Sequence, residues 1–414
     1  MTGRTVLVIG AGAVGSVCAL RLQERGFQVT LVDRDAPGQG ASFGNASVIA
    51  ATEVVPIASP GVMKNVPKWL LSPNGPLFLE PAYLPELLPW LLRFLRNSTR
   101  ARTEANAAAL ASLCCRAVAD TRAWLSDLAL DAEMTQNASL RLYPSLAAIE
   151  ADAYKLGLRK RHGVDYEIID AAGIQQLEPC ITGPYGAAVL TPGAYYLHDP
   201  VRPILRSTER LKALGGQVLA AEVARLDTGE NAPAVRLSGG DVLRADHVVL
   251  AAGIWSGDLA RGAGDRFPLE SERGYHVQYT GLDLGLSRGL VDTARGFAVS
   301  PVEAGLRVAG TVEFRGTSAP LDPRRTRVLE KHARTMFGEG LAGKPRTTWL
   351  GHRPSLPDSL PVIGPSLRQK GLFYAFGHGH LGLTLAATTA HMIADMLGGH
   401  RPVADPAPFS ANRF

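Results

Sequence analysis

An apolar strand that ends in a glycine-rich turn constrains the fold of this chain more than any other segment. Residues Thr5–Ile9 read as a buried strand, and Gly10, Gly12 and Gly15 follow it in the pattern Gly-x-Gly-x-x-Gly. These glycines allow a tight turn, a close approach of the backbone to phosphates and close packing of the next helix. The free N–H groups at the start of that helix attract an anion. The pattern predicts a βαβ unit that holds the pyrophosphate of a dinucleotide.

A second strand and the acid that ends it support this interpretation. Residues 27–32 read as a strand that closes on Asp33, which follows Gly15 by 18 residues. This is near the spacing of the carboxylate that binds a ribose 2′-OH, and its charge disfavours the 2′-phosphate of NADP. The alternative is an ordinary βαβ unit without a ligand. The residues expected to contact the dinucleotide here are the turn glycines with Ala13, Val14, Asp33 and Arg34.

Composition limits the remaining possibilities. A chain of 414 residues that is 46% hydrophobic can bury two cores, which predicts two domains. The net charge of +5 is spread along the chain, so no nucleic-acid partner is expected. The four cysteines lack metal-like or redox-like spacing, so no metal site is expected. No run approaches the roughly 18–20 apolar residues of a membrane span. We expect a cytoplasmic protein, with peripheral attachment to the inner face of the membrane as an open alternative.

Strand-like and helix-like segments alternate in a way that favours an α/β fold with an inserted domain. Five apolar segments are assigned to one doubly wound sheet: Thr5–Ile9, Gln28–Val32, Val218–Val223, His247–Ala251 and Leu372–Phe376. Three others show partial period-2 alternation typical of an antiparallel sheet: Arg273–Tyr279, Gly296–Ser300 and Arg307–Phe314. The expected dinucleotide domain comprises residues 1–56, 146–256 and 346–414. The expected α+β substrate domain comprises residues 57–145 and 257–345.

Two further glycine clusters point from a nicotinamide to a flavin. Residues 245–256 read as a strand that ends at Gly253, and residues 373–384 form a strand–glycine–helix junction. The second junction places N–H donors and a positive helix end at another point in space. A nicotinamide enzyme needs only the first anion site, whereas reduced flavin carries negative charge that these donors would stabilise. The alternative is two ordinary helix starts.

Together these segments resemble the D-amino-acid oxidase superfamily of FAD enzymes, and most of all its bacterial D-amino-acid dehydrogenases, including those that act on hydroxy-D-proline. The resemblance runs from residue 1 to about 400. It rests on the Gly10–Gly15 turn with Asp33, residues 41–47, 60–62, 68–69 and 248–256, and the blocks Gly351-His352-Arg353-Pro354, Pro357-Asp358 and Pro361-Val362-Ile363-Gly364-Pro365.

The resemblance implies a Rossmann-like FAD domain and a set of FAD contacts. Beyond the residues named above, these contacts are Ser42, Asn45, Ala46, Ser47, Val223, Ala252, Gly253, Trp255, Gly379, His380, Leu381, Gly382 and Thr384. The C-terminal glycine block contains no cysteine, where some relatives attach flavin covalently, so the FAD is expected to be non-covalent. This chain has Gly44 and Ser47 where dehydrogenase relatives often carry Ala and Gly, so substrate choice cannot be copied from one relative.

The expected substrate-binding residues are Arg353, Arg273, Tyr275 and His276. Amine oxidation needs a carboxylate held in place, and a guanidinium binds a carboxylate in bidentate fashion. The resemblance places Arg353 over the flavin, with a structural salt bridge as the alternative. Arg273 is the second choice, and alternation puts Tyr275 on its strand face. His276 could face the substrate, but a lone histidine here favours the alternative of a structural or solvent-facing position. No residue is assigned as a certain catalyst, because positioning dominates this chemistry.

The expected activity is oxidation of D-amino acids, with electrons passed to a quinone-like acceptor. Cyclic amines such as D-proline or hydroxy-D-proline are expected to be accepted, because Gly44, Ala46 and Ser47 are small and carry no charge. One alternative is an O₂-using oxidase of D-amino acids or of sarcosine- and glycine-type amines. Another is the FAD subunit of a hetero-oligomeric amine dehydrogenase. The sequence does not fix the oligomeric state.

Residues Leu84–Arg96 read as an amphipathic helix, with leucines on one face and arginines nearby. Such a helix either lies on a membrane surface or packs in the core, and the sequence leaves both open.

Overall fold

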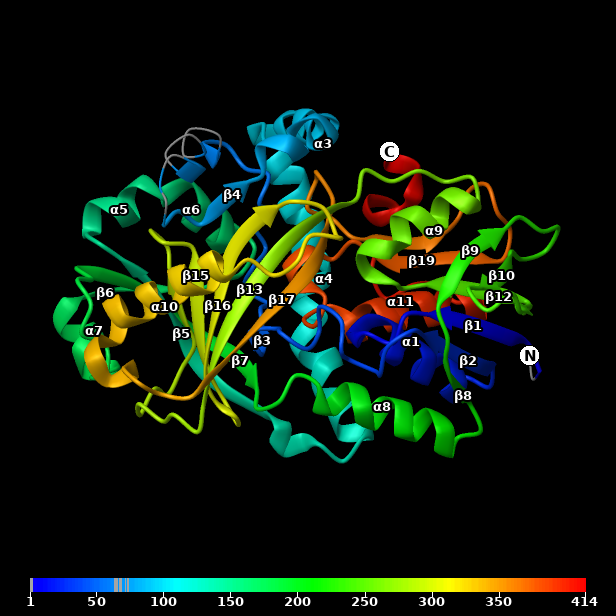
Figure 1. Cartoon of the computed structure of the whole chain (residues 1–414), viewed down its shortest axis with the longest axis horizontal. Helices are drawn as coiled ribbons and strands as arrows, with labels where there is room; N and C mark the ends of the chain where they lie inside the picture. The colour runs from blue at the N-terminus through cyan, green and yellow to red at the C-terminus, as the bar shows by residue number, and fades with distance from the viewer. Residues whose placement is uncertain (1–2, 63–65, 67–68, 71, 73) are drawn as a thin grey trace.

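The computed structural model describes residues 3–62, 66, 69–70, 72 and 74–414. Lys68, which contributes to the resemblance described above, lies outside these residues. Two sheets dominate the molecule, one in each half, and both chain ends lie in the half that contains β1 and β2 (Figure 1).

The first sheet is the predicted dinucleotide-binding sheet. Its strand order is β18-β19-β12-β1-β2-β8, and all neighbours are parallel except the edge pair β18–β19. The strands are β1 (Thr5–Ile9), β2 (Gln28–Asp33), β8 (Gln217–Ala220), β12 (His247–Leu250), β18 (Val362–Pro365) and β19 (Leu372–Phe376). The five segments assigned to one sheet are therefore confirmed. The third is shorter than expected, because Val223 starts a separate antiparallel sheet formed by β9 (Val223–Asp227), β10 (Ala234–Leu237) and β11 (Val242–Leu243).

Helices cover one face of this sheet because their apolar residues point to it. Helix α1 (Ala13–Glu24) packs against α11 (Ala386–Gly398) and α8 (Arg202–Ala213), and α11 packs against α4 (Arg100–Asp127). Val17 and Leu20 of α1 are completely buried in this core. The side chain of Thr99 accepts a hydrogen bond from the Arg102 N–H and so caps α4. Helix α9 (Ser256–Gly262) and the small sheet cover the other face.

The second sheet is long, curved and mostly antiparallel, with the order β17-β13-β16-β15-β14-β5-β7-β3. β14 pairs with β5 in parallel, and two side strands, β4 and β6, join β16 and β7. The bounds are β3 (Val48–Ile49), β4 (Leu77–Leu79), β5 (Met134–Tyr143), β6 (Glu167–Asp170), β7 (Ala187–Leu197), β13 (Glu270–Thr280), β14 (Leu290–Asp292), β15 (Phe297–Val302), β16 (Gly305–Phe314) and β17 (Arg346–Ser355).

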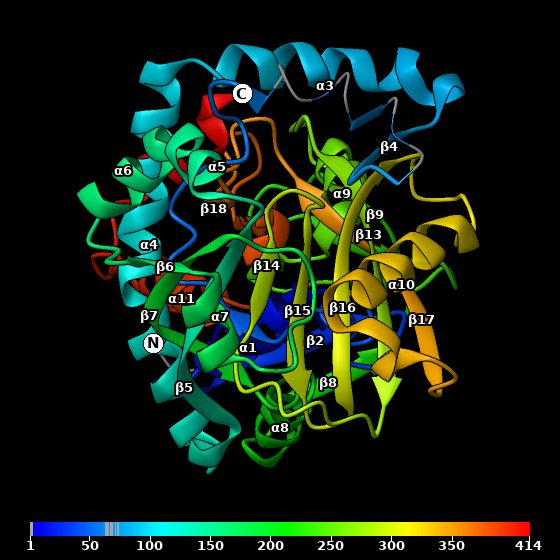
Figure 2. The same ribbon diagram turned by 90° about the vertical axis from the view of Figure 1, so that its left-hand side faces the viewer.

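Helices α10 (Pro323–Phe337) and α7 (Ala171–Leu177) lie in front of this sheet in Figure 2. Leu329, Ala333 and Met336 of α10 are fully buried in a core with Tyr275 and Val277 of β13. Helices α5 (Leu146–Ala151) and α6 (Ala153–Arg161) flank β5 and β7. The uncovered face of the sheet is therefore directed toward the first domain.

Three parts of the chain lie in a different domain from the one that the sequence predicted. β6 and β7 were expected in residues 146–256 of the dinucleotide domain, but they pair in the second sheet. β17 does so as well, although it begins the segment 346–414. Conversely, α4 was expected in the substrate domain, yet Leu110 and Leu113 are buried in the core of the first sheet. These long-range pairings leave no mark in local periodicity.

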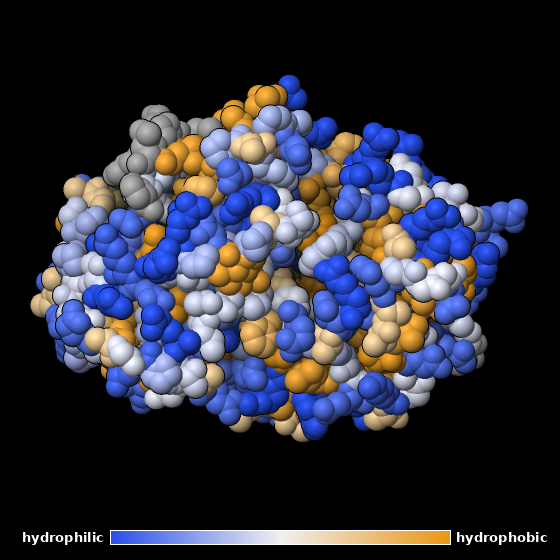
Figure 3. All heavy atoms as spheres, viewed as in Figure 1, coloured by the Kyte–Doolittle hydropathy of each residue, from blue (hydrophilic) through white to orange (hydrophobic). Residues whose placement is uncertain are grey.

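Helix α3 (Leu84–Asn97) has two apolar sides rather than one. Leu87, Trp90 and Phe94 are buried, and Trp90 packs against Phe314. Four other leucines are 40–48% exposed, namely Leu84, Leu88, Leu92 and Leu95. Figure 3 shows hydrophobic residues at the surface over α3. Within the described residues, no helix combines the length and apolar character that crossing a membrane requires.

The packing of α1 on β1 generates a testable prediction. A Cβ atom at Gly15 would lie 1.8 Å from the Gly10 carbonyl oxygen, so Gly15→Ala must force the helix away from the turn. Overpacking of this kind costs about 1–3 kcal/mol of stability. We expect a lower thermal unfolding midpoint for Gly15→Ala. The control is Gly157→Ala, whose added Cβ would meet nothing within 4 Å. Equal midpoints for the two variants would contradict the close packing.

Candidate functional site

A large cavity of about 750 Å³ connects the two domains. One end is formed by the Gly10–Val14 turn and the ends of β2 and β12, and the other by β13, β15, β16 and β17. Most of the expected FAD contacts line this cavity: Gly10, Gly12, Ala13, Val14, Asp33, Arg34, Ser42, Asn45, Ala46, Val223, Ala252, Gly253, Trp255, Gly379, His380 and Gly382. The structure therefore brings together residues from five distant parts of the chain.

Four expected contacts lie behind the wall and support it. Gly15 underlies the turn, as described above. Ser47 is fully buried with a positive φ of 60°, and its N–H donates to the Asn45 side chain at 2.7 Å. The Thr384 hydroxyl accepts a hydrogen bond from the Ala50 N–H at 2.9 Å. Leu381 is buried in the first core. Burial by neighbouring segments, which local sequence does not reveal, keeps these side chains from the cavity.

The glycine turn forms a cradle for phosphate. Gly10 has a φ of 105°, and a Cβ there would lie 2.5 Å from the Ala251 carbonyl oxygen. The Asp33 carboxylate accepts a hydrogen bond from the Ala11 N–H at 2.5 Å, and the Ser42 hydroxyl accepts one from the Ala13 N–H at 3.0 Å. These contacts fix the loop so that the remaining donors at the start of α1 face the cavity.

A stacked pair closes the end of the cavity near β2 and β12. The Arg34 guanidinium lies 4.0 Å from the centre of the Trp255 ring. Glu222 lies 3.7 Å from Arg34 and balances its charge. Both stacked side chains and Val223 line the cavity here, so a flat, partly polar group such as a nucleotide base fits between the strands.

The loop 43–46 is attached to the second sheet by Arg307, a residue that sequence reasoning missed. Its guanidinium donates to the carbonyl oxygens of Asn45 at 2.5 Å and Phe43 at 3.3 Å, and to Gln278 at 2.9 Å. Burial lowers the pKa of Arg307 to about 10. Because one side chain binds two carbonyl groups of this loop, the two domains are held together beside the cavity.

Trp349 fills the space that was expected to admit a cyclic substrate. A Cβ at Gly44 would lie 2.0 Å from the Trp349 ring, and one at Gly351 would lie 1.9 Å from it. His276 stacks on this ring at 5.1 Å, and its Nδ1 lies 3.3 Å from the Gly44 carbonyl oxygen. His276 is thus covered by Trp349 and does not line the cavity. Gly44 makes room for the indole rather than for substrate.

Arg353 lies on the cavity face of the second sheet. β13 and β17 pair so that Glu272 is opposite Arg353 and Gly274 is opposite Gly351, and all four residues line the cavity. The guanidinium lies over Gly274, where a Cβ would be 2.3 Å from its Cζ atom, and it donates to the Thr311 carbonyl oxygen at 3.2 Å. Burial lowers the pKa of Arg353 and raises that of Glu272, although each charge stabilises the other.

Arg273 lies on the opposite face, which corrects its assignment as a substrate ligand. It is completely buried and forms an ion pair with Glu313 at 3.0 Å. Alternation does place Tyr275 on the same face, as expected. Tyr275 contributes to the cavity wall, but its hydroxyl group is hydrogen-bonded to Glu313. These side chains therefore belong to the core under the sheet, where a buried pair must stay intact.

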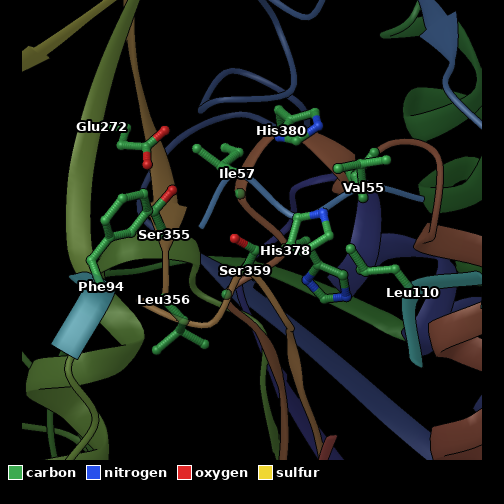
Figure 4. Close-up of a pocket in the computed structure, with 14 residues that line it drawn as sticks. Val55, Ile57, Phe94, Leu110, Glu272, Ser355, Leu356, Ser359, His378 and His380 are labelled. Carbon is green, nitrogen blue, oxygen red and sulfur yellow. The ribbon is translucent and has the colours of Figure 1, made fainter. Parts of the chain in front are cut away.

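A small chamber of about 10 Å³ adjoins the large cavity (Figure 4). This is close to the space that one water molecule needs. Glu272 and His380, which line both spaces, approach the chamber from different sides in Figure 4. His378 also borders it, and its Nε2 lies 2.9 Å from the Thr389 hydroxyl. The rest of the chamber lining is largely apolar, and it includes Val55, Ile57 and Leu110.

Two charged residues at the substrate end of the cavity were not expected. Glu53 follows β3, and Arg141 lies on β5. The expectation of an uncharged substrate pocket is therefore not supported. Neither residue carries a sequence signal, because only the pairing of β3 and β5 with β7 brings them together. Within the described residues, no cluster of histidine, cysteine and acidic side chains could hold a metal ion.

Buried histidines make the stability fall in acid. Burial lowers the pKa of His276, His352 and His380 to about 4 and that of His378 to about 3. In the unfolded chain these rings take up protons near pH 6.5, whereas the folded protein keeps them neutral. The stability that they contribute is present above pH 6.5 and is lost as the pH falls toward 4. Glu272, whose pKa is raised, opposes this effect.

We expect His378→Gln to weaken this pH dependence. The variant lacks one ring that titrates only when unfolded, so its loss of stability between pH 7.5 and 5.5 is smaller by about 1.4 kcal/mol. Urea unfolding of both proteins at the two pH values measures the difference. An identical pH dependence in the two proteins would show that His378 takes up its proton as readily in the folded protein as in the unfolded chain.

The cavity fits a flavin dinucleotide, since a phosphate cradle, a base-sized slot and a second glycine junction lie along one continuous space.

The family model described as DAO, FAD dependent oxidoreductase, matches residues 5–396. A D-amino-acid oxidase of Bradyrhizobium diazoefficiens is 36% identical, and the match covers 100% of this chain and 99% of the relative. D-amino acid dehydrogenase 2 of Ralstonia nicotianae is 32% identical, with 99% and 100% covered. Glycine oxidase of Geobacillus kaustophilus shares the fold, with a TM-score of 0.77 at 18% identity and full coverage of both chains. The chain therefore belongs to the DAO family of FAD-dependent oxidoreductases.

Proposed function

We propose that this protein oxidises the amine group of D-amino acids and passes the electrons to a quinone-like acceptor. Bound FAD, which the resemblance predicts to be non-covalent, supplies the two-electron acceptor for the amino-acid Cα–N bond. The product imine then reacts with water to give a 2-oxo acid and ammonia. The relatives named for D-amino-acid oxidation support the substrate class.

Arg353 carries this proposal. Its buried guanidinium lines the cavity and donates a hydrogen bond to the Thr311 carbonyl oxygen, and no ion pair of Arg353 is found within the described part of the chain. A desolvated cation without an ion-pair partner favours an anionic ligand. The substrate carboxylate is the anion that this chemistry offers. Glu272, opposite Arg353 in the strand pair, limits the surplus charge when no substrate is bound.

The surrounding residues orient the substrate and exclude water. Gly274 leaves room for the Arg353 side chain, the Thr311 carbonyl oxygen accepts a hydrogen bond from it, and His380 presents a neutral ring to the cavity. With the carboxylate held, the Cα–H bond must point to the flavin, so only one enantiomer directs its side chain into the free part of the cavity. The D preference comes from the relatives' names.

We expect Arg353→Met to retain FAD and to lower kcat/KM for D-amino acids by roughly 30-fold or more, because removal of one partner from a desolvated charge pair costs about 2–5 kcal/mol. Gly274→Ala should lower kcat/KM as well, since the added Cβ displaces the guanidinium without removing it. Gly157→Ala is the matched control and should be unchanged. Steady-state kinetics with an artificial acceptor, with FAD content measured by absorbance, tests the set. Normal kcat/KM in Arg353→Met would exclude Arg353 as the carboxylate ligand.

The electron acceptor distinguishes a dehydrogenase from an oxidase. The relatives include both types, so their names do not decide it. The exposed leucines of α3, with Arg93 and Arg96 on the same helix, support contact with an anionic membrane surface, where quinones reside. The proposal therefore includes contact between helix α3 and a membrane surface.

Anaerobic mixing with paired enantiomers tests stereochemistry and acceptor together. We expect D-alanine to bleach the flavin absorbance and L-alanine to leave it unchanged. A soluble quinone should then restore the absorbance faster than air-saturated buffer does. Reduction by L-amino acids or by sarcosine alone contradicts the D preference. Faster recovery with O₂ identifies an oxidase, and no reduction without a second subunit identifies part of a hetero-oligomer.

A further inference from the structure

Three charged side chains form a cluster at the substrate end of the cavity, which we call the Arg141 cluster: Glu53, Arg141 and Arg159. One oxygen of the Glu53 carboxylate contacts the Arg141 guanidinium, and the other accepts a hydrogen bond from Arg159 at 3.0 Å. Both Glu53 and Arg141 line the cavity, whereas Arg159 on α6 lies behind them and is 8% exposed. Each Glu53 oxygen is therefore occupied by a guanidinium.

The cluster has more positive than negative charge. Two guanidinium groups share one carboxylate, and the nearby Asp152 is paired with Lys155 at 3.2 Å and accepts a hydrogen bond from Tyr143 at 3.0 Å. Burial and the repulsion from Arg159 lower the pKa of Arg141 to about 9. Among the described residues, Glu53 is the ion-pair partner of Arg141. A second anion would stabilise this guanidinium.

The Arg141 cluster is close to the proposed carboxylate ligand. Arg141 and Arg353 line the same cavity as His380, and the charges of both guanidinium groups add to the effect of burial in lowering the pKa of His380. His380 is neutral and adds no charge of its own. One small molecule with two carboxylates therefore has two cationic groups within the same space, one on β17 and one on β5.

We propose that Arg141 binds a second carboxylate, that of the substrate side chain, so that the preferred substrates are dicarboxylic D-amino acids of the D-aspartate and D-glutamate type. This inference rests on the proposed function, in which Arg353 binds the α-carboxylate. The planar guanidinium of Arg141 offers paired donors that match a carboxylate, and a cationic side chain would meet repulsion here. The reaction itself is the same for any D-amino acid.

Matched substrate pairs test the proposal. D-glutamate and D-glutamine differ in charge but hardly in shape, as do D-aspartate and D-asparagine. We expect the wild-type protein to prefer the acid by about tenfold or more in kcat/KM, as a charge-assisted hydrogen bond predicts. Arg141→Met should abolish this preference, because it should lower kcat/KM for D-glutamate much more than kcat/KM for D-glutamine. Glu53→Gln should increase the preference, because it releases the Arg141 guanidinium. Arg206→Gln, at an exposed position on α8, is the charge control and should behave as wild type.

Binding without turnover gives a second measurement. Glutarate should shift the flavin absorbance of the wild-type protein at lower concentration than butyrate does, and Arg141→Met should remove the difference. If Arg141→Met does not fold, the Glu53→Gln variant and the comparison of glutarate with butyrate still test whether Arg141 binds a second carboxylate. Equal rates with D-glutamate and D-glutamine overturn the inference but leave the proposed function intact. Failure of every D-amino acid to reduce the flavin overturns both.

Discussion

The pairing of β13 with β17 is the constraint on which the rest of the site depends. It sets Gly274 opposite Gly351, so that two neighbouring positions on the cavity face have no side chain. Arg353 occupies the space over Gly274, and Trp349 occupies the space between Gly351 and Gly44. A shift of one residue would turn both side chains to the other face of the sheet. The register between β13 and β17 therefore determines which side chains form this part of the cavity wall.

Face and partner decide what each buried arginine does. Arg273 and Arg353 lie on neighbouring strands of one sheet, yet Arg273 points to the core and is neutralised by Glu313 at 3.0 Å. Arg353 points to the cavity, has Glu272 nearby and retains the capacity to bind an anion. Arg307 takes a third role, since its guanidinium holds the loop 43–46 by two carbonyl oxygens. The presence of an arginine in a strand therefore does not indicate its function until its sheet face and its ion-pair or hydrogen-bond partner are known.

The glycine turn, the acid that ends the second strand and the five strands of the first sheet could be predicted from the sequence. Each is a local signal: apolar runs, glycines at fixed spacing and a carboxylate after a strand. The expected domain bounds differed at β6, β7 and β17, because sheet membership depends on pairing with other segments of the chain, and at α4, because its apolar residues pack in the core of the first sheet. Glu53, Arg141 and Trp349 were missed for the same reason. Gly44 was recognised as small, but the sequence does not show which neighbour uses the space.

The sequence by itself determined a dinucleotide site of the flavin type, because phosphate binding needs a particular backbone conformation that glycine spacing encodes directly. Its resemblance to the family also predicts that Arg353 belongs to a motif near the flavin. The tertiary structure alone decided which charges share the substrate end of the cavity. Ion pairing and desolvation depend on distances between side chains from different strands, and these distances are fixed only when the second sheet closes over the first domain.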